Sequence, residues 1–412
     1  MSSRLRVLIP LLAVLAAAPA ARADVVTDWN AKAEAIGLEK RLPPPPNART
    51  MAMMHVAMFE AANAAQPRYA PYQLKLVAEP GASPEAAAAS AAHGVLVVLF
   101  PDQQASLDTT LRASLAQVPD GEPRTRGVAL GQKAAAGVLA LRAKDGITAA
   151  ENYRPVTSAG VYVPTVVPVS STIGRLAPWV MSAGDQFRPA PPPSLDSPTW
   201  TADLNEIREI GGRTSSKRTP EQTEIGKFWV VTGPHCWNPI VRQLAVAKKL
   251  DVTDSARLFA LVAMATADSF VAVFEAKYHY NLWRPLTAIR NADITGNAAT
   301  PREASWLPLV DTPMHPEYPC AHCISSTAAA TVLQQVLGDD LPELSMTSPA
   351  LPGVTRRWTT LKAYSDEVSS ARIYGGIHYR FSTIAAQEMG RKIAELTTTT
   401  MLLPAKAPIA GR

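Results

Sequence analysis

The chain has 412 residues, of which 47% are hydrophobic and 18% are charged. These proportions are typical of a globular protein with a large core, and the length indicates one large domain or roughly two smaller ones. The formal net charge of +5 includes three arginines within residues 1–23, a stretch without acidic residues, so the rest of the chain carries +2. A balance this close to neutral gives no reason to expect a nucleic-acid partner.

Residues 1–23 are predicted to be a signal peptide. Arg4 and Arg6 precede an apolar run from Val7 to Ala18, and Ala21-Arg22-Ala23 resembles a cleavage site. The run is too short to span a bilayer, and no other uninterrupted apolar stretch of about 18 residues follows it. We therefore expect a soluble, periplasmic or secreted protein without a membrane span in the mature chain; its oligomeric state is not indicated.

The fold class is predicted to be all-α, because apolar residues recur at helical spacing and no segment alternates notably with a period of two. A proline run, Pro43–Pro46, interrupts the first helical stretch, and Thr219-Pro220-Glu221-Gln222 is typical of a helix start. The expected helices occupy residues 24–66, 84–100, 103–118, 124–144, 203–210, 222–231, 241–250, 255–284, 325–337, 356–375 and 382–397.

Composition divides the mature chain into four parts. Residues 24–146 form an N-terminal helical region, and residues 147–200 form a connection too rich in proline for long helices. Residues 201–400 form a second helical bundle, and residues 401–412 form a tail. The connection is longer than a passive linker needs, so it either shapes an access channel or covers an edge of the core.

Three clusters carry the chemistry, and they begin at Lys277, Tyr318 and Ala371. Lys277 and Arg284 are seven residues apart, which places them on one face of a continuous helix, two turns apart. With Arg372 and two histidines they form a site for a multiply charged oxyanion, because arginine binds tetrahedral oxyanions bidentately and lysine adds a point charge. The alternative is a set of surface charges and capping histidines.

The order of the clusters resembles the type 2 phosphatidic acid phosphatase and vanadium haloperoxidase superfamily. Its signature has three parts in order. The first is a lysine followed, after six residues, by Arg-Pro; the second is Pro-Ser-Gly-His; the third is Ser-Arg followed, after five residues, by a histidine. The matching segments here are Lys277 to Pro285, Pro319 to His322, and Arg372 to His378. Leu282-Trp283-Arg284-Pro285-Leu286 and His378-Tyr379-Arg380-Phe381 favour the vanadium haloperoxidase branch over the membrane lipid phosphatases.

The resemblance implies helical bundles of the vanadium haloperoxidase and acid phosphatase type, with vanadate as cofactor. Lys277, Arg284 and Arg372 would neutralise its oxygens, and Lys277 would also polarise bound peroxide. His378 would be the protein ligand of the metal, or the nucleophile that forms a phosphohistidine in a phosphatase. His322 would be the acid–base group. The implied partners are hydrogen peroxide, a halide and a small organic substrate.

Two departures from the family pattern bear on the chemistry. Cys320-Ala321 stands where the family has Ser-Gly, so a weak thiol donor replaces a hydroxyl, while the Ala321 N–H is kept. A helix that begins near Ser325 would direct its positive end at the anion. Ser382 stands where phosphatases of the family commonly have the aspartate that orients the histidine, which favours vanadate.

His315 lies seven residues before His322. At this offset the resemblance implies a residue beside the cofactor, as with the histidine of bromoperoxidases in place of the phenylalanine of chloroperoxidases. The other interpretation is a loop histidine between Pro313 and Pro316.

The three cysteines leave their pairing open, because Cys236 could join Cys320 or Cys323. A zinc site at Cys320-Ala-His322-Cys323 would need further ligands, and the chain has no second Cys-x-x-Cys.

The sequence therefore predicts a vanadium-dependent haloperoxidase-like enzyme that oxidises halide with peroxide on a histidine-bound vanadate. The alternative is a periplasmic acid phosphatase that uses the same site, with phosphate as substrate or mimic of vanadate. A third class is a non-catalytic oxyanion-binding protein.

Overall fold

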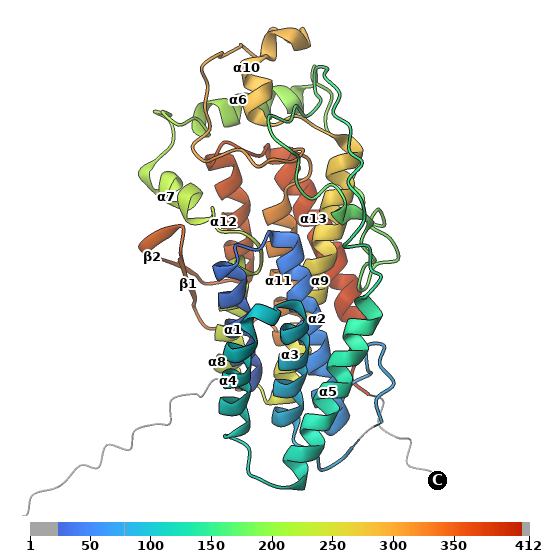
Figure 1. Ribbon diagram of the computed structural model, residues 1–412. Coiled ribbons are helices and arrows are strands. Elements are labelled where there is room, and N and C mark those ends of the chain that lie inside the picture. The colour runs from blue at the N-terminus through green and yellow to red at the C-terminus, as the bar shows by residue number, and fades with distance from the viewer. Residues whose placement is uncertain (1–23, 78, 406–412) are drawn as a thin grey trace, which may run out of the picture.

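The computed structural model describes residues 24–77 and 79–405; the predicted signal peptide lies outside the described residues. The described part contains 13 α-helices, short 3-10 turns and a two-stranded sheet. The predicted all-α class is confirmed, and the long helices run alongside one another (Figure 1).

The N-terminal helices form a first bundle in which α3 packs between α2 and α5. Side chains cap several helix starts: Asp24 accepts a hydrogen bond from the Thr27 N–H, and Ser83 accepts one from the Ala86 N–H. Gly131 lets α5 approach α3 closely, because a Cβ there would lie 2.4 Å from the Ala87 carbonyl oxygen. The elements are α1 (Val25–Glu39), α2 (Pro44–Ala65), α3 (Pro84–Leu99), η1 (Pro101–Gln103), α4 (Gln104–Leu115) and α5 (Glu122–Arg142).

The C-terminal helices form a second bundle around α9, which also contacts α2 of the first bundle. A single apolar core therefore runs through both bundles. Gly390 allows α13 to approach α11, since a Cβ there would lie 2.4 Å from the Ile324 carbonyl oxygen. The elements are α8 (Asn238–Ala247), α9 (Val252–Tyr280), α11 (Ala321–Leu337), α12 (Leu361–Tyr374) and α13 (Arg380–Thr400).

A second, aromatic cluster lies at the end of the molecule that carries α6 and α10, opposite α3, α4 and α5 (Figure 1). The Trp200 ring lies 6.2 Å from that of Trp283 and 5.0 Å from that of Tyr379, measured between centroids. The remaining elements are η2 (Ile173–Arg175), α6 (Pro198–Ile210), α7 (Pro220–Phe228), η3 (Gly233–Cys236), α10 (Pro285–Arg290) and η4 (Ala292–Thr295). A helix starts at Thr219-Pro220, as the sequence predicted, and Thr219 and Gln222 form a capping box there.

The helix predicted over residues 255–284 is wrong at its C-terminal end. Helix α9 stops at Tyr280, and Asn281 adopts a left-handed conformation with φ of 50°. Arg284 is extended, because the ring of Pro285 disfavours a helical conformation in the preceding residue. Lys277 and Arg284 therefore do not share a helical face.

The helix predicted over residues 356–375 is also wrong in its first part. Strands β1 (Leu344–Ser348) and β2 (Leu351–Trp358) pair antiparallel, with Leu344 opposite Trp358. Helix α12 starts at Leu361, where the Thr360 side chain accepts a hydrogen bond from the Ala363 N–H. The alternation in β2 was hard to recognise because charged and polar residues occupy much of this largely exposed strand.

Helix α11 begins earlier than predicted. It starts at Ala321 rather than near Ser325, with Cys320 as the N-cap residue. His322 therefore belongs to the first turn of the helix, and its side chain has a fixed direction relative to the helix axis.

The proline-rich connection is fastened to α9 by one carboxylate. Asp268 is fully buried and accepts hydrogen bonds from the backbone N–H groups of Trp179, Val180 and Met181, at 2.6, 2.8 and 2.9 Å. The Arg142 guanidinium lies 4.2 Å from the centre of the Trp179 ring, which holds the same segment against α5. The connection is thus an ordered layer.

Among the described residues, α9 is long and apolar enough to cross a membrane, and 94% of its most apolar window is buried inside the protein. Core helices of soluble proteins pass the same test of length and composition.

We predict that Asp268→Ala lowers the free energy of unfolding by at least about 3 kcal/mol, because each buried donor without an acceptor costs roughly 1–3 kcal/mol. Urea denaturation followed by circular dichroism measures this change. Asp196→Ala is the control, because Asp196 is exposed in the same connection. A loss below about 0.5 kcal/mol, the range of ordinary surface substitutions, would contradict the fastening role.

Candidate active site

Lys277 occupies the last turn of α9 and is completely buried. Its Nζ donates hydrogen bonds to the carbonyl oxygens of Pro316 and Glu317, at 3.0 and 2.7 Å. Burial, and then the nearby charge of Arg284, hold the pKa of Lys277 well below its usual value. The lysine thus connects α9 to the loop before α11.

Arg284 joins two loops that are far apart in the sequence. Its Nε donates to the His315 carbonyl at 2.8 Å, and its Nη1 donates to the Ile377 carbonyl at 2.9 Å. The same Nη1 lies 3.2 Å from Nε2 of His378, and Nη2 lies 3.0 Å from Nδ1 of His315. Burial lowers the pKa of Arg284 to about 10.

Arg372, in the last turn of α12, is the third buried cation. Its Nη1 donates to the Trp229 carbonyl, and its Nε is buried without a hydrogen-bond partner. Burial lowers the pKa of Arg372 to about 10. An orphaned guanidinium N–H is a donor directed at a group that the protein itself does not supply.

Lys277, Arg284 and Arg372 are hereafter called the cationic cluster, and the nearby charge of Glu317 offsets only part of the positive charge of Lys277 and Arg284. Among the residues that the structure describes, none of the three forms an ion pair with a carboxylate within 4.0 Å. Buried charges in proteins are normally paired or bound to a ligand. An anion among them would compensate their charges and raise their pKa values again.

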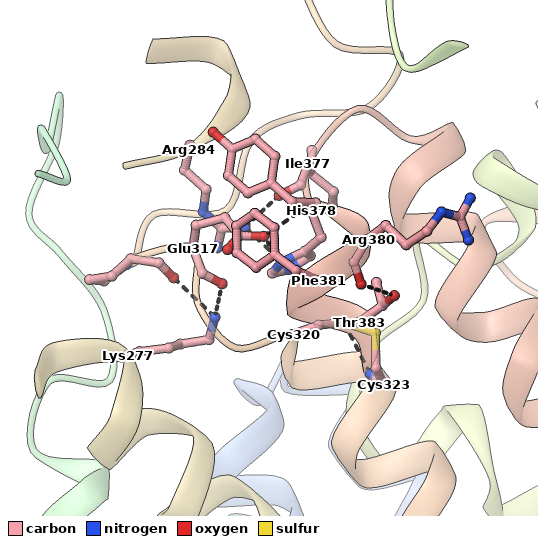
Figure 2. A network of polar contacts seen from close by, with 12 residues as sticks. Lys277, Arg284, Glu317, Cys320, Cys323, Ile377, His378, Arg380, Phe381 and Thr383 are labelled. Atoms are coloured by element: carbon pink, nitrogen blue, oxygen red, sulfur yellow. Dashed lines mark hydrogen bonds and ion pairs between the residues drawn. A yellow bond between two sulfur atoms is a disulfide. The ribbon is translucent and has the colours of Figure 1, made fainter. Parts of the chain in front are cut away.

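His378 contacts both Arg284 and the buried carboxylate of Glu317, and Figure 2 shows these three residues together. Its Nδ1 is 2.8 Å from Oε1 of Glu317, and the same oxygen accepts the Tyr379 N–H at 3.0 Å. The carboxylate fixes the tautomer: Nδ1 carries the proton, and the Nε2 lone pair points towards Arg284. Burial, and then the charge of Arg284, hold the pKa of His378 well below its usual value.

Glu317 is the functional residue that the sequence reasoning missed. The aspartate expected four residues after the histidine is Ser382 here, but the carboxylate comes from a different loop. Burial raises the pKa of Glu317 to about 7, against the opposing effect of Lys277 and Arg284. The available signal was an acidic residue in Pro316-Glu317-Tyr318-Pro319, beside the second cluster.

The other two predicted histidines also meet at this site. His322 Nε2 lies 3.0 Å from the Val231 carbonyl oxygen, and the His315 ring meets the Phe274 ring edge-on at 5.1 Å between centroids. Burial holds the pKa values of both histidines well below the usual value. The charge of Arg372 lowers the pKa of His322 further, and that of Arg284 lowers the pKa of His315. His315 contacts Arg284 directly, so it is part of the site.

The cysteines next to His322 form a disulfide that settles the pairing left open by the sequence. Cys320 is bonded to Cys323, and Cys236 is a free, buried thiol. The Cys320 sulfur accepts the Cys323 N–H at 3.2 Å as the N-cap of α11. The weak thiol donor expected at Cys320 is therefore absent, because the sulfur carries no hydrogen. The pairing also removes both thiolates that a zinc site would use.

A cavity of about 580 Å³ opens beside the three histidines. One wall is Pro43–Pro46 at the start of α2, another is Phe270 and Phe274 on α9, and a third comes from residues of the proline-rich connection such as Ile173. The connection therefore lines the approach to the site, which supports its predicted role in an access channel.

Together these residues form a cluster of buried cations and histidines beside a largely apolar cavity in a helical-bundle protein. Residues 257–404 match a family model described as the VCPO second helical-bundle domain. The vanadium chloroperoxidase of Curvularia inaequalis is 25% identical over 285 residues, which are 52% of this chain and 46% of that protein. The aligned part is thus less than half the length of this curated relative.

Solved structures show the same fold over nearly the whole chain. The crystal structure of the first bacterial vanadium-dependent iodoperoxidase aligns with a TM-score of 0.79 and 24% identity, covering 93% of this chain and 97% of that one. An apo-type bacterial vanadium-dependent chloroperoxidase aligns with a TM-score of 0.68 and 16% identity, covering 86% and 92%. Together with the family model, these matches confirm the resemblance to the vanadium haloperoxidase branch.

We predict that a thiol reagent labels no cysteine in the native protein, one after denaturation without reductant, and all three after reduction. The native thiol is unreactive because burial raises the pKa of Cys236 to about 12. Mass spectrometry counts the labels, and a Cys236→Ser variant should lose the single label. Two or more labels without reductant would contradict the disulfide.

Proposed function

We propose that this protein is a vanadium-dependent haloperoxidase, which uses hydrogen peroxide to oxidise a halide. The observation that carries the proposal is the cationic cluster, whose three buried charges form no ion pair with a carboxylate of the described residues. Vanadate is a multiply charged tetrahedral oxyanion, so it matches both the charge and the donors of the cluster.

The residues present fit vanadate in further respects. His378 offers an Nε2 lone pair beside Arg284, and its Nδ1–H is held by Glu317, which is the arrangement that metal-bound histidines commonly show. Ala321 lies in the first turn of α11, at the positive end of the helix dipole, and lines the same cavity as His378. Bound vanadate would act as a Lewis acid that activates peroxide towards halide.

The side chains then have separate tasks in this reaction. Arg284 and Arg372 would hold oxygen atoms of the anion, and Lys277 would polarise bound peroxide by placing a positive charge beside it. His322 has a depressed pKa and stays a neutral imidazole, so it can accept a proton from peroxide and return it to the leaving oxygen. Glu317 keeps His378 oriented throughout.

A periplasmic acid phosphatase is the second candidate, and Glu317 is the observation that favours it. Ser382, at the position where phosphatases of the family commonly have an aspartate, does not favour a phosphohistidine because serine supplies no negative charge. The Glu317 carboxylate at 2.8 Å from Nδ1 of His378 supplies that charge from another loop. His378 therefore has the support that a nucleophilic imidazole needs.

We also propose that the protein works in the periplasm or is secreted. The signal-peptide pattern of residues 1–23 supports export. The Cys320–Cys323 disulfide supports it independently, since disulfides persist mainly in oxidising compartments.

The proposed function is tested with protein that is purified without phosphate and then loaded with orthovanadate. With peroxide and bromide or iodide, it should halogenate a colorimetric reporter only when vanadate is present. His378→Ala should reduce turnover by more than about 100-fold, because even the loss of an outer partner of a metal ligand commonly costs roughly 10–100-fold. His279→Ala is the matched control, since this histidine is exposed.

The remaining outcomes separate the other classes. Hydrolysis of an aryl phosphate that vanadate inhibits, without halogenation, would make the protein a phosphatase. Phosphate binding that survives in His378→Ala, without either activity in the wild type, would make it a binding protein.

A further prediction concerns Glu317→Gln, which keeps the shape of the side chain and removes its charge. We expect vanadate affinity and turnover to fall roughly 10–100-fold, as for other outer partners of metal-bound histidines. Isothermal titration with orthovanadate measures the affinity separately from turnover. Glu303→Gln is the control on an exposed glutamate. Unchanged affinity and turnover would show that the carboxylate does not support His378.

A further inference from the structure

The cavity in front of the histidines is larger than hydrogen peroxide and a halide ion require. Its volume of about 580 Å³ lies in the range of roughly 300–1,000 Å³ that is typical of sites for small organic molecules. Peroxide and a halide ion need only a small part of this space. The volume indicates a third reactant that is considerably larger.

The walls indicate the chemistry of that reactant. Pro43–Pro46 offer no backbone N–H donors, because proline lacks this group, and Phe270 and Phe274 present aromatic rings. The lining residues include no lysine, arginine, aspartate or glutamate. A charged ligand would lose its hydration here without gaining an acidic or basic side chain of opposite charge from this lining.

Three histidines line the cavity next to the cationic cluster, since His315 and His378 contact Arg284 and His322 lines the same cavity. The other polar side chains of the lining are the hydroxyls of Ser170, Thr172, Thr232 and Ser325. A few polar groups in an otherwise apolar cavity fix the orientation of a ligand.

The mouth is apolar as well. Met314 and Val169 are 47% and 40% exposed, and the Val169 N–H donates to the Met314 carbonyl at 2.9 Å. Val166 and Val167, on the same segment, are 50% and 79% exposed but do not line the cavity. Exposed apolar side chains gathered around an opening mark a surface that receives an apolar ligand.

We propose that this cavity binds a neutral, apolar, ring-containing organic molecule, which receives the oxidised halogen while it is bound. The inference rests on the proposed function for the origin of the halogen. In the transfer, hypohalous acid loses its halogen to a ring carbon as the O–X bond breaks and a C–X bond forms. The displaced ring proton and the hydroxide leave as water, so the step needs no additional oxidant.

The binding test uses vanadate-free protein, so it does not depend on any activity. Isothermal titration with 1-naphthol, which is neutral at pH 7, should show saturable binding to the wild type. Met314→Glu should weaken binding at least about ten-fold, equivalent to 1.4 kcal/mol, because it places a carboxylate at the mouth. Met314→Leu should retain the affinity, and so should Val167→Glu, because Val167 is exposed on the same segment but does not line the cavity.

A charged analogue distinguishes the walls from the cationic cluster. We expect 1-naphthalenesulfonate, which has the same rings, to bind at least about ten-fold more weakly than 1-naphthol. Tighter binding of the sulfonate would show that the cluster selects the ligand, and would overturn the proposal. No saturable binding of 1-naphthol, or equal affinity in Met314→Glu, would overturn it too.

The last measurement addresses the transfer and separates the two proposals. With vanadate, peroxide and bromide, the ratio of 2-bromo- to 4-bromo-1-naphthol should differ from the ratio that reagent hypobromous acid gives. An identical ratio would overturn transfer within the cavity while leaving the haloperoxidase function intact. Binding of 1-naphthol without any halogenation would overturn the proposed function and the transfer, but not the ligand class.

Discussion

The burial of Lys277, Arg284 and Arg372 without carboxylate partners is the constraint on which the site depends. The protein stabilises them with backbone carbonyls, which carry only partial negative charge and cannot neutralise them. The accepting carbonyls belong to residues 229, 315, 316, 317 and 377, in three separate segments of the chain. The same hydrogen bonds that leave the charges uncompensated therefore hold the ends of α9, α12 and the loop before α11 together.

The placement of Glu317 preserves this positive charge. Its backbone carbonyl accepts a hydrogen bond from Lys277, whereas its carboxylate accepts one from Nδ1 of His378. A carboxylate bonded directly to Lys277 would have neutralised part of the cluster and weakened the attraction for an anion. Directed at the imidazole instead, it fixes the tautomer that leaves Nε2 free to act as ligand or nucleophile. Both candidate reactions need this tautomer, so the site geometry alone supports both.

The sequence predicted the fold class and most of the site because helical periodicity and short motifs are local. The cations and histidines fall at fixed spacings within three clusters, and the structure brings them together. The features it missed depend on contacts between distant segments. Glu317 contacts His378 only because the loop before α11 packs against the segment that follows α12. Residue spacing within one segment cannot predict such a contact. The predicted end of α9 was too late for a different reason. The long apolar pattern of the helix was given more weight than the effect of Pro285 on the conformation of Arg284.

Helix α9 links the cationic cluster to the cavity. Phe270, Phe274 and Lys277 follow the spacing i, i+4, i+7, so they lie along one face. The two rings line the cavity, and the ammonium group joins the cationic cluster beyond it. Asp268, earlier on the same helix, fastens the connection near the segment that forms another wall. Because one rigid helix carries the rings, the cation and the fastening carboxylate, the distance between a ligand in the cavity and an anion in the cluster is set by the helix itself.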